Sequence, residues 1–175
     1  MILRAASNRI EPMLQKIVSG GQTGADRAGL DAAIEVGIQV GGYCPKGRLA
    51  EDGIIPERYP LIELTKGGYK ARTEKNVVES DGTLVLNVGK LTGGTKMTLE
   101  YAIKHGKPFL VVQLEEQPKP ETVIQWLEKY AILTLNIAGP RESKIPQGIY
   151  QQGFSFLRVM LIKLPEMIAV KGATQ

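Results

Sequence analysis

The sequence predicts an α/β protein with three layers (α/β/α), in which helices cover both faces of a mainly parallel sheet of about six strands. Three observations lead to this fold class. Six short apolar runs recur along the 175 residues, and segments of helical length separate most of them. Several runs are also too continuously apolar for a strand that has one face in water. Alternation of strand and helix indicates parallel strands joined by right-handed crossovers.

The predicted strands are the apolar runs themselves, at residues 16–19, 38–41, 61–64, 83–88, 109–113 and 132–137. The predicted helices lie at residues 25–36, 69–80, 95–105, 120–130 and roughly 146–164. Residues 45–60 break the alternation, because their three prolines and two glycines predict an irregular excursion. Ligand-binding loops are often found in such segments.

The helix predicted at 146–164 is apolar on more than one face, whereas a helix that packs only on a sheet needs a single apolar face. Its apolar residues are Phe154, Phe156, Leu157, Val159, Met160, Leu161, Ile162 and Leu164. Two interpretations stay open. The helix is buried beneath the N-terminal segment, or it forms the interface of a homo-oligomer.

Composition excludes several functional classes. With a single cysteine and a single histidine, the chain builds neither a disulfide framework nor a metal centre rich in these residues, so we assign no metal ligands. The histidine, His105, stands before Gly106 and Pro108, where it suits the end of a helix. Neither a G-x-x-x-x-G-K-[ST] nor a G-x-S-x-G motif occurs, which excludes a P-loop NTPase and an α/β-hydrolase nucleophile elbow.

Length, hydropathy and charge set further expectations. No linker or repeat divides residues 1–175, so we expect a single domain. No run approaches the roughly 20 apolar residues of a membrane span, and charges interrupt residues 1–15, so we expect a cytoplasmic protein without a membrane partner. The net charge of +4 suits an anionic small-molecule ligand. Nucleic acid is a less favoured partner, because its binding needs Lys and Arg concentrated on one face.

Two glycine-rich loops are the strongest signals for a binding site. Residues 19–26 read Ser-Gly-Gly-Gln-Thr-Gly-Ala-Asp between the first predicted strand and helix. Such a turn presents backbone N–H groups and a positive helix end to an anion. Thr23 with Asp26 also fits a helix capping box, which is the alternative role for these two side chains.

The second loop, residues 89–95, again lies between an apolar strand and a helix. In the usual doubly wound order, strands 16–19 and 83–88 are neighbours, so their loops face each other across a ligand crevice. The alternative is that both loops are ordinary tight turns.

Basic side chains at the same predicted edge complete the candidate site. Lys46 and Arg48 follow the second strand, where a dinucleotide enzyme would carry an acidic residue. Arg72 opens a helix, and Arg141 leaves the last strand, where it could grip a phosphate. A solvated surface position is the alternative for each arginine. The candidate binding residues are Gly20, Gly21, Gln22, Thr23, Gly24, Lys46, Arg48, Arg72, Thr92, Gly93, Gly94, Thr95 and Arg141.

The combination of these stretches resembles the molybdenum carrier family (molybdenum cofactor carrier-like proteins). The matching stretches are residues 19–26, 45–48 with 50–53, Arg72-Thr73 with Asn76, 80–83, 93–95 and 138–143. The family is similar to a wider Rossmann-like group of lysine-decarboxylase-like and nucleotide-sensing proteins. The resemblance implies an anionic ligand held by residues 20–24 and 93–95, either molybdenum cofactor (molybdopterin), in a carrier or storage role, or a nucleotide.

The wider group also includes nucleoside-monophosphate phosphoribohydrolases, whose second loop has the form P-G-G-x-G-T-x-x-E. This chain keeps Gly93, Gly94 and Thr95, but it lacks the proline and the third glycine, and Glu100 falls five residues after Thr95. A non-catalytic binding protein is therefore the favoured interpretation, and no catalytic residue is assigned. A hydrolase of N-glycosidic bonds, with Glu100, Asp26 or Glu142 as its acid–base carboxylate, is the alternative.

Overall fold

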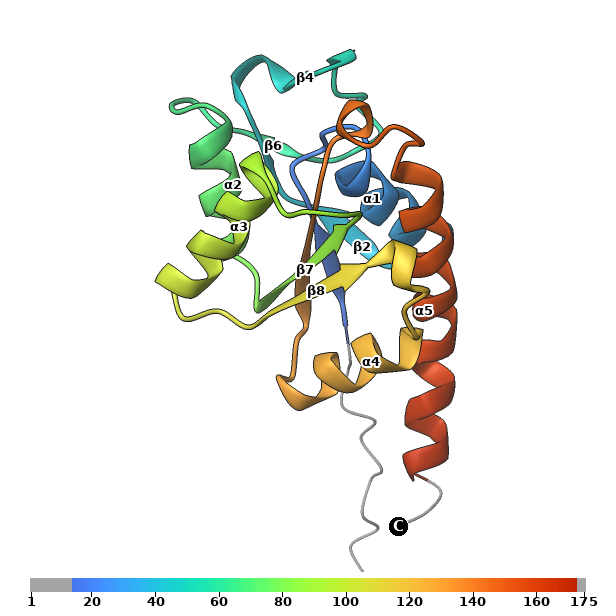
Figure 1. Ribbon diagram of the computed structural model, residues 1–175. Coiled ribbons are helices and arrows are strands. Elements are labelled where there is room, and N and C mark those ends of the chain that lie inside the picture. Colours follow the sequence, from blue (N-terminus) through green and yellow to red (C-terminus); the bar gives the residue numbers. More distant parts are fainter. Residues whose placement is uncertain (1–13, 173–175) are drawn as a thin grey trace, which may run out of the picture.

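A computed structural model describes the backbone of residues 14–172 and the side chains of residues 14–165. Within these residues, five strands form a central sheet in the order β2-β1-β9-β7-β8 (Figure 1), and all its pairs are parallel. The strands are β1 (Lys16–Val18), β2 (Gln39–Gly41), β7 (Gly82–Asn87), β8 (Phe109–Gln113) and β9 (Thr134–Ala138). The parallel sheet confirms the predicted α/β fold class.

Helices cover both faces of the sheet, as a three-layer fold requires. On one side, α2 (Tyr69–Val78) packs against α3 (Gly93–Lys104). On the other side, α5 (Tyr150–Gly172) contacts both α1 (Ala25–Glu35) and α4 (Pro120–Lys129), as Figure 1 shows. The arrangement is Rossmann-like, and no helix of the described residues is both long and apolar enough to cross a membrane.

The strand order corrects one prediction. β9, the last strand in the chain, lies between β1 and β7, so the strands at 16–19 and 83–88 are not neighbours. Leu135 and Ile137 of β9 are fully buried, and β7 is buried along its whole length. Both strands are therefore suited to the interior of the sheet, but apolar patterning shows only that a strand is covered and not which strand lies beside it.

The run at 61–64 does not join the central sheet. It contains β6 (Ile62–Glu63), which pairs with β3 (Tyr43–Cys44) in a separate two-stranded sheet. Gly42 separates β2 from β3 with a φ of 124°, and its Cα packs so closely on the Ser19 carbonyl that a Cβ would lie 2.2 Å from that oxygen. The chain therefore turns out of the central sheet at Gly42, and the strand that follows pairs elsewhere.

Two helices differ from their predicted bounds. α3 begins at Gly93 rather than at residue 95, so Gly93 and Gly94 of the second loop belong to its first turn. α5 begins at Tyr150 because the Glu142 carboxylate accepts hydrogen bonds from the N–H groups of Ile149 and Tyr150 (2.9 and 2.8 Å). It continues to Gly172 with Pro165 inside it, since a proline removes one helical hydrogen bond without having to end the helix.

The irregular excursion at 45–60 is confirmed. It contains a short 3₁₀ turn (Lys46–Arg48) and an antiparallel hairpin of β4 (Leu49–Ala50) and β5 (Gly53–Ile54). A second small core beneath it consists of the buried side chains Leu30, Cys44, Ile55, Tyr59 and Leu61. Cys44 therefore packs in the interior.

The apolar surface of α5 is mostly used within the chain. Leu157, Met160, Leu161 and Leu164 are buried in the main core, whereas Val159 and Ile162 remain exposed. The N-terminal segment that we considered as a cover for this helix lies outside the described residues.

Candidate functional site

A cavity of about 780 Å³ opens at the carboxyl ends of the central strands, between α2, α3 and the segment that follows β9. This volume is in the range of small-molecule sites, about 300–1,000 Å³. Residues from four parts of the chain line it: Gly20, Gln22, Asp26, Tyr69, Lys70, Arg72, Thr73, Asn76, Thr92, Gly93, Gly94, Thr95, Met97, Thr98, Asn136, Ile137, Ala138, Gly139, Pro140, Arg141 and Lys144. Eight of the thirteen candidate binding residues are in this set, so both glycine loops contribute to one cavity even though β9 separates their strands.

The amino end of α3 is the part of the cavity best suited to an anion. The first N–H groups of a helix have no partner within it, and the helix dipole adds partial positive charge. The Lys96 N–H is the first to bond along α3, to the Thr92 carbonyl at 3.3 Å, and the Thr92 side chain makes no capping hydrogen bond. A Cβ built at Gly93 or Gly94 would meet nothing within 4 Å. A ligand can therefore approach the N–H groups of this turn.

The lining of the cavity carries an excess of positive charge. Four basic side chains, Lys70, Arg72, Arg141 and Lys144, stand against one carboxylate, Asp26. Asp26 is paired with Arg72, and the Arg141 Nε lies 3.7 Å from a carboxylate oxygen of Glu51, so Lys70 and Lys144 contribute most of the positive field that a ligand meets. An anionic ligand is favoured there over a neutral or cationic one.

Arg72 and Asp26 form the one ion pair in which both partners line the cavity. Their Nη1 and Oδ2 atoms lie 3.0 Å apart, and both side chains are largely buried. Arg72 lies directly over Gly20, so closely that a Cβ at that position would lie 1.6 Å from Nη1. Gly20 is therefore needed for space: any side chain there would displace the guanidinium.

Two atoms of this pair bear on ligand binding. The Arg72 Nε–H is buried without a hydrogen-bond partner in the structure, which is a cost that an acceptor from a ligand would relieve. Burial raises the pKa of the Asp26 carboxyl, while the neighbouring Arg72 charge and the Gln22 N–H oppose that rise.

The first glycine loop is closed rather than open. Gly24 has a φ of 79°, and a Cβ there would lie 2.6 Å from the Pro140 carbonyl and 2.7 Å from the Glu142 nitrogen. The Ala25 N–H donates to that same Pro140 carbonyl (3.2 Å), so the segment after β9 covers the amino end of α1. Gly21, Thr23 and Gly24 are outside the cavity lining, so the structure does not bring them together with the other candidate binding residues.

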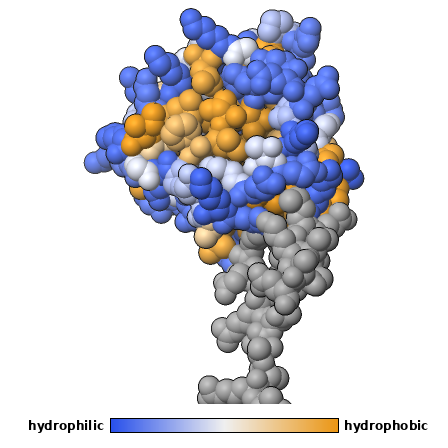
Figure 2. Space-filling view, turned by 60° about the horizontal axis from the view of Figure 1, so that its bottom comes forward, coloured by the Kyte–Doolittle hydropathy of each residue, from blue (hydrophilic) through white to orange (hydrophobic). Residues whose placement is uncertain are grey.

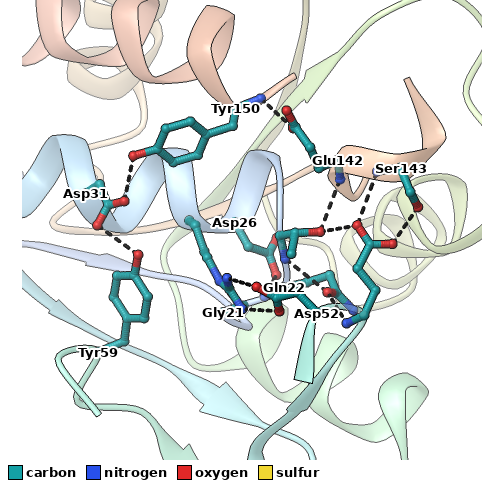
Figure 3. Close-up of polar contacts among 12 residues, drawn as sticks. Gly21, Gln22, Asp26, Asp31, Asp52, Tyr59, Glu142, Ser143 and Tyr150 are labelled. Carbon is teal, nitrogen blue, oxygen red and sulfur yellow. Dashed lines mark hydrogen bonds and ion pairs between the residues drawn. The ribbon is translucent and has the colours of Figure 1, made fainter. Parts of the chain in front are cut away.

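The capping box proposed for Thr23 and Asp26 is also absent. Gly24 is the N-cap of α1 and no side chain caps it. The Thr23 hydroxyl donates to Glu51 and accepts from the Glu142 N–H (3.2 Å), while Asp26 accepts from the Gln22 N–H (3.1 Å). Figure 3 shows these contacts, which join the first glycine loop, the β4–β5 hairpin and the segment at 141–143.

Glu51 is the centre of this closed network. It accepts hydrogen bonds from the Ser143 N–H (3.1 Å) and hydroxyl, and its own N–H donates to the Gln22 side chain (2.9 Å). Burial is the largest single effect and would raise the pKa of Glu51, but the hydrogen bonds from Ser143 and Thr23 and the charge of Arg141 together hold it below the usual range of a glutamate. Residues 50–53, which the sequence analysis placed near the ligand, therefore hold the first glycine loop and the segment at 141–143 together.

Arg48 has a structural role in the excursion and is outside the cavity lining, apart from the candidate residues that line it. Its guanidinium donates to four carbonyl oxygens of the excursion, those of Ile55, Pro56, Tyr59 and Leu61, at 2.9–3.2 Å. All its donors point into the loop that it stabilises. Lys46 is exposed and is outside the cavity lining.

Sequence reasoning missed several lining residues. Lys70 and Lys144 extend the basic surface and Tyr69 stands beside Arg72, whose guanidinium lies 5.9 Å from the centre of the ring. Their only signal in the sequence is proximity to Arg72 and Arg141. Asn76, which we expected at this edge, lines the cavity. Its side-chain amide accepts a hydrogen bond from the Tyr43 N–H (2.8 Å) and donates one to the Tyr43 carbonyl (2.9 Å).

The three carboxylates considered for hydrolysis differ in position. Glu100 is well exposed and outside the cavity lining. Glu142 accepts hydrogen bonds from the backbone at the start of α5 and is also outside the cavity lining. Asp26 alone of the three lines the cavity. In the described part of the chain, no three His, Cys, Asp or Glu side chains lie close enough together to hold a metal ion.

Comparisons with known proteins agree with this picture. Residues 17–161 match the family of circularly permutated YpsA SLOG proteins. The chain is also similar to a crystal structure described as a "putative molybdenum carrier protein" from Syntrophus aciditrophicus, with 47% identity and a TM-score of 0.80. The similarity covers 86% of this chain and 96% of that one. Among curated proteins no match is found.

Proposed function

We propose that this chain, which belongs to the circularly permutated YpsA SLOG family, binds a phosphate-bearing small molecule in the cavity between α2 and α3. Molybdenum cofactor is the first candidate, in a carrier or storage role. The observation that carries the proposal is the uncapped amino end of α3, which opens into a cavity lined by Lys70, Arg72, Arg141 and Lys144.

The residues of the cavity fit the chemistry of such a ligand. A phosphate is bound well by the N–H groups of a helix amino end, where Gly93, Gly94 and Thr95 leave room for close approach. The buried Arg72 Nε–H offers a further donor to an oxyanion. Molybdopterin carries a phosphate on a heterocycle with polar edges, and the cavity also contains the amide side chains of Gln22 and Asn136.

The relative from Syntrophus aciditrophicus supports the cofactor candidate, because its name is that of a molybdenum carrier. When bound, the cofactor would supply the metal and its redox chemistry. The residues of this chain would bind and orient the phosphate and exclude water from the buried end of the cavity.

A binding experiment tests the proposal. Thermal unfolding is followed with purified molybdopterin, with a panel of nucleoside monophosphates and with inorganic phosphate. A ligand present at 100 times its dissociation constant stabilises the folded state by roughly 2.7 kcal/mol, which is a readily measured shift. Added salt should weaken the effect, since the proposed contacts are ionic.

Two variants at one position make the test specific for α3. Gly94→Glu places a carboxylate in the first helical turn, where it stabilises the helix by about 0.3–1 kcal/mol but repels an incoming anion. Gly94→Ala is the matched control, because a Cβ there meets no neighbour. We expect Gly94→Ala to bind like the wild type and Gly94→Glu to lose the ligand-induced shift. The proposal is wrong if no ligand of the panel shifts the transition, or if both variants bind alike.

Hydrolysis of a nucleotide N-glycosidic bond is a second candidate, and one observation favours it. Asp26 lines the cavity with a pKa that burial raises, which is the state in which a carboxyl donates a proton to a leaving base. Chromatography for free base, after incubation with the nucleoside monophosphates, tests this activity. We expect release by the wild type and none by Asp26→Asn; no release above background by the wild type would exclude the activity for these substrates.

A further inference from the structure

The strand β8 forms one edge of the central sheet. It pairs only with β7 among the described strands, and Figure 1 shows it at the front of the molecule with no strand or helix across its outer side. An edge strand presents a row of N–H and C=O groups that can pair with a strand of another chain.

The ladder with β7 determines which residues of β8 present these groups. The Thr83 N–H of β7 donates to the Pro108 carbonyl (3.0 Å), and Leu84 is the partner of Leu110 in the register. Because backbone direction alternates along a strand, Leu110 and Val112 turn their backbone groups toward β7. Phe109, Val111 and Gln113 therefore turn theirs outward.

The surface around this edge is apolar and lacks the usual protection. Natural edge strands carry lysines, prolines or bulges that discourage pairing, but β8 reads Phe-Leu-Val-Val-Gln without a charge. Phe109 is 39% exposed, and Ile103 at the end of α3 is 66% exposed. Figure 2, which turns the lower side of Figure 1 forward, shows a continuous apolar area framed by polar residues. We call Ile103, Phe109, Leu110, Val111 and Gln113 the β8 edge surface.

Charges at the two ends of β8 have opposite sign. Lys104 and Lys107 precede the strand, while Glu115 and Glu116 follow it. When two copies of one strand pair across a two-fold axis, they run antiparallel, so the start of each lies beside the end of the other. Lys107 of one copy then lies near Glu115 and Glu116 of the second copy at both ends. Lys104 takes no part, because it is paired with Glu74 of its own chain (2.7 Å). Within each chain Lys107 also donates to the Ser80 carbonyl (2.8 Å), and Glu115 accepts from the Gly89 N–H (2.6 Å). A parallel arrangement would instead place like charges together.

We propose that a second copy of this chain docks on the β8 edge surface, with the two β8 strands antiparallel and centred on Val111. In this register Val111 pairs with its own equivalent, and Phe109 pairs with Gln113 of the second copy. The outward N–H and C=O groups become bonded, the two sheets join into one continuous sheet, and the apolar area is covered. The dimer does not depend on the function proposed for the cavity.

The C-terminal helix is the competing interface. Its exposed apolar residues Val159 and Ile162 lie on a helix whose other faces already pack on α1 and α4. A helix surface of this kind has no unpaired backbone groups, whereas the edge of β8 presents a row of them. The β8 edge surface therefore has the stronger need for a partner.

The mass of the full-length chain in solution tests the proposal, measured by light scattering after size exclusion over a dilution series. We expect the wild type to be a dimer. Val111→Pro removes an outward N–H while leaving the ladder to β7 intact, since Val111 does not bond to β7; we expect the mass to fall by half. Ile162→Lys is the matched control on α5 and should remain a dimer. Circular dichroism and thermal unfolding establish that each variant is folded.

A charge reversal tests the antiparallel orientation and does not depend on the proline. Glu116→Lys places a cation opposite Gly106 of the second copy, next to Lys107, and should weaken the dimer several-fold. Adding Lys107→Glu should restore it. A monomeric wild type, a dimer that Ile162→Lys but not Val111→Pro dissociates, or a failure of the second charge change to restore pairing would each overturn the proposal. So would a dimer that forms only when residues 1–13 are deleted, because that segment would then be the occupant of the surface.

Discussion

Removal of Arg72 should destabilise the fold, because it leaves the buried Asp26 carboxylate without its ion-pair partner. In Arg72→Met the Asp26 carboxylate, which is 5% exposed, keeps the Gln22 N–H at 3.1 Å but loses the guanidinium at 3.0 Å. Removing one partner of a buried ion pair costs about 3–5 kcal/mol of folding free energy. Because one hydrogen bond survives and the carboxyl can take up a proton, we expect about 3 kcal/mol, the lower end of that range.

The converse change should cost less. Asp26→Asn leaves Arg72, whose side chain lines the cavity and is 13% exposed, so its charge can reach water. We expect a loss of about 1–2 kcal/mol. The double variant removes both charges, and its cost should also be about 1–2 kcal/mol rather than the sum of the two. The coupling energy is then about 3 kcal/mol, at the upper end of the values for groups in direct contact.

The pair also predicts a dependence on pH. The folded-state pKa of Asp26 is raised above its ordinary value of 3.8, so the folded state disfavours the charged carboxylate. The contribution of Asp26 to stability is therefore largest below 3.8 and is lost as pH rises through the folded-state pKa. Without Arg72 the pKa rises further, so the cost of Arg72→Met should shrink as the solution is made more acidic.

Urea unfolding of the wild type, the two single variants and the double variant measures these values by linear extrapolation, at neutral and acidic pH. Additive costs, a cost of less than about 1 kcal/mol for Arg72→Met, or a cost that does not change with pH would refute the reasoning.

Three further predictions follow from the residues around the cavity. Arg48→Met should destabilise the fold by about 2–4 kcal/mol, because four carbonyls lose a charged donor, while ligand affinity stays unchanged; urea unfolding and ligand titration measure the two effects, and lost affinity in a stable variant would contradict the structural role. Gly24→Ala should cost about 2–4 kcal/mol, since its φ is 79° and the backbone of 140–142 fills the space of a Cβ; an unchanged transition would contradict the closed loop. Tyr59→Phe should cost about 1 kcal/mol through the lost hydrogen bond to Asp31 (2.9 Å; Figure 3). Since the folded state raises the pKa of Tyr59 to about 12, that stability should fade as pH rises from 10 toward 12 in the wild type but less in the variant.

Much of the fold could be predicted, because burial leaves a direct trace in the sequence. The six-residue β7 is buried on every position and was recognisable as a continuous apolar run. The order of strands could not be predicted, because β9 is equally apolar and nothing in its residues specifies β1 and β7 as its neighbours. The excursion was recognisable from its prolines and glycines, but the pairing of β3 with β6, the two strands that flank it, depends on the turn at Gly42.

The candidate site divides along similar lines. The second glycine loop was predicted correctly as a lining segment, because strand, glycine turn and helix occur in uninterrupted order. The first loop has the same local pattern, yet the segment at 140–142 covers it, and that contact joins residues more than a hundred positions apart. The structural contacts of Arg48 could not be predicted for the same reason: a guanidinium that binds a phosphate and one that binds four loop carbonyls look alike in sequence.

The central claim is that an anion binds at the amino end of α3, beside Arg72. Titration of ¹⁵N-labelled protein with inorganic phosphate, followed by amide and arginine Nε chemical shifts, tests it directly. We expect saturable chemical-shift changes at the amides of Gly93, Gly94 and Thr95 and at the Arg72 Nε–H, and little change at the amide of Gly24. Shifts confined to the first glycine loop, or no saturable change at α3, would contradict it.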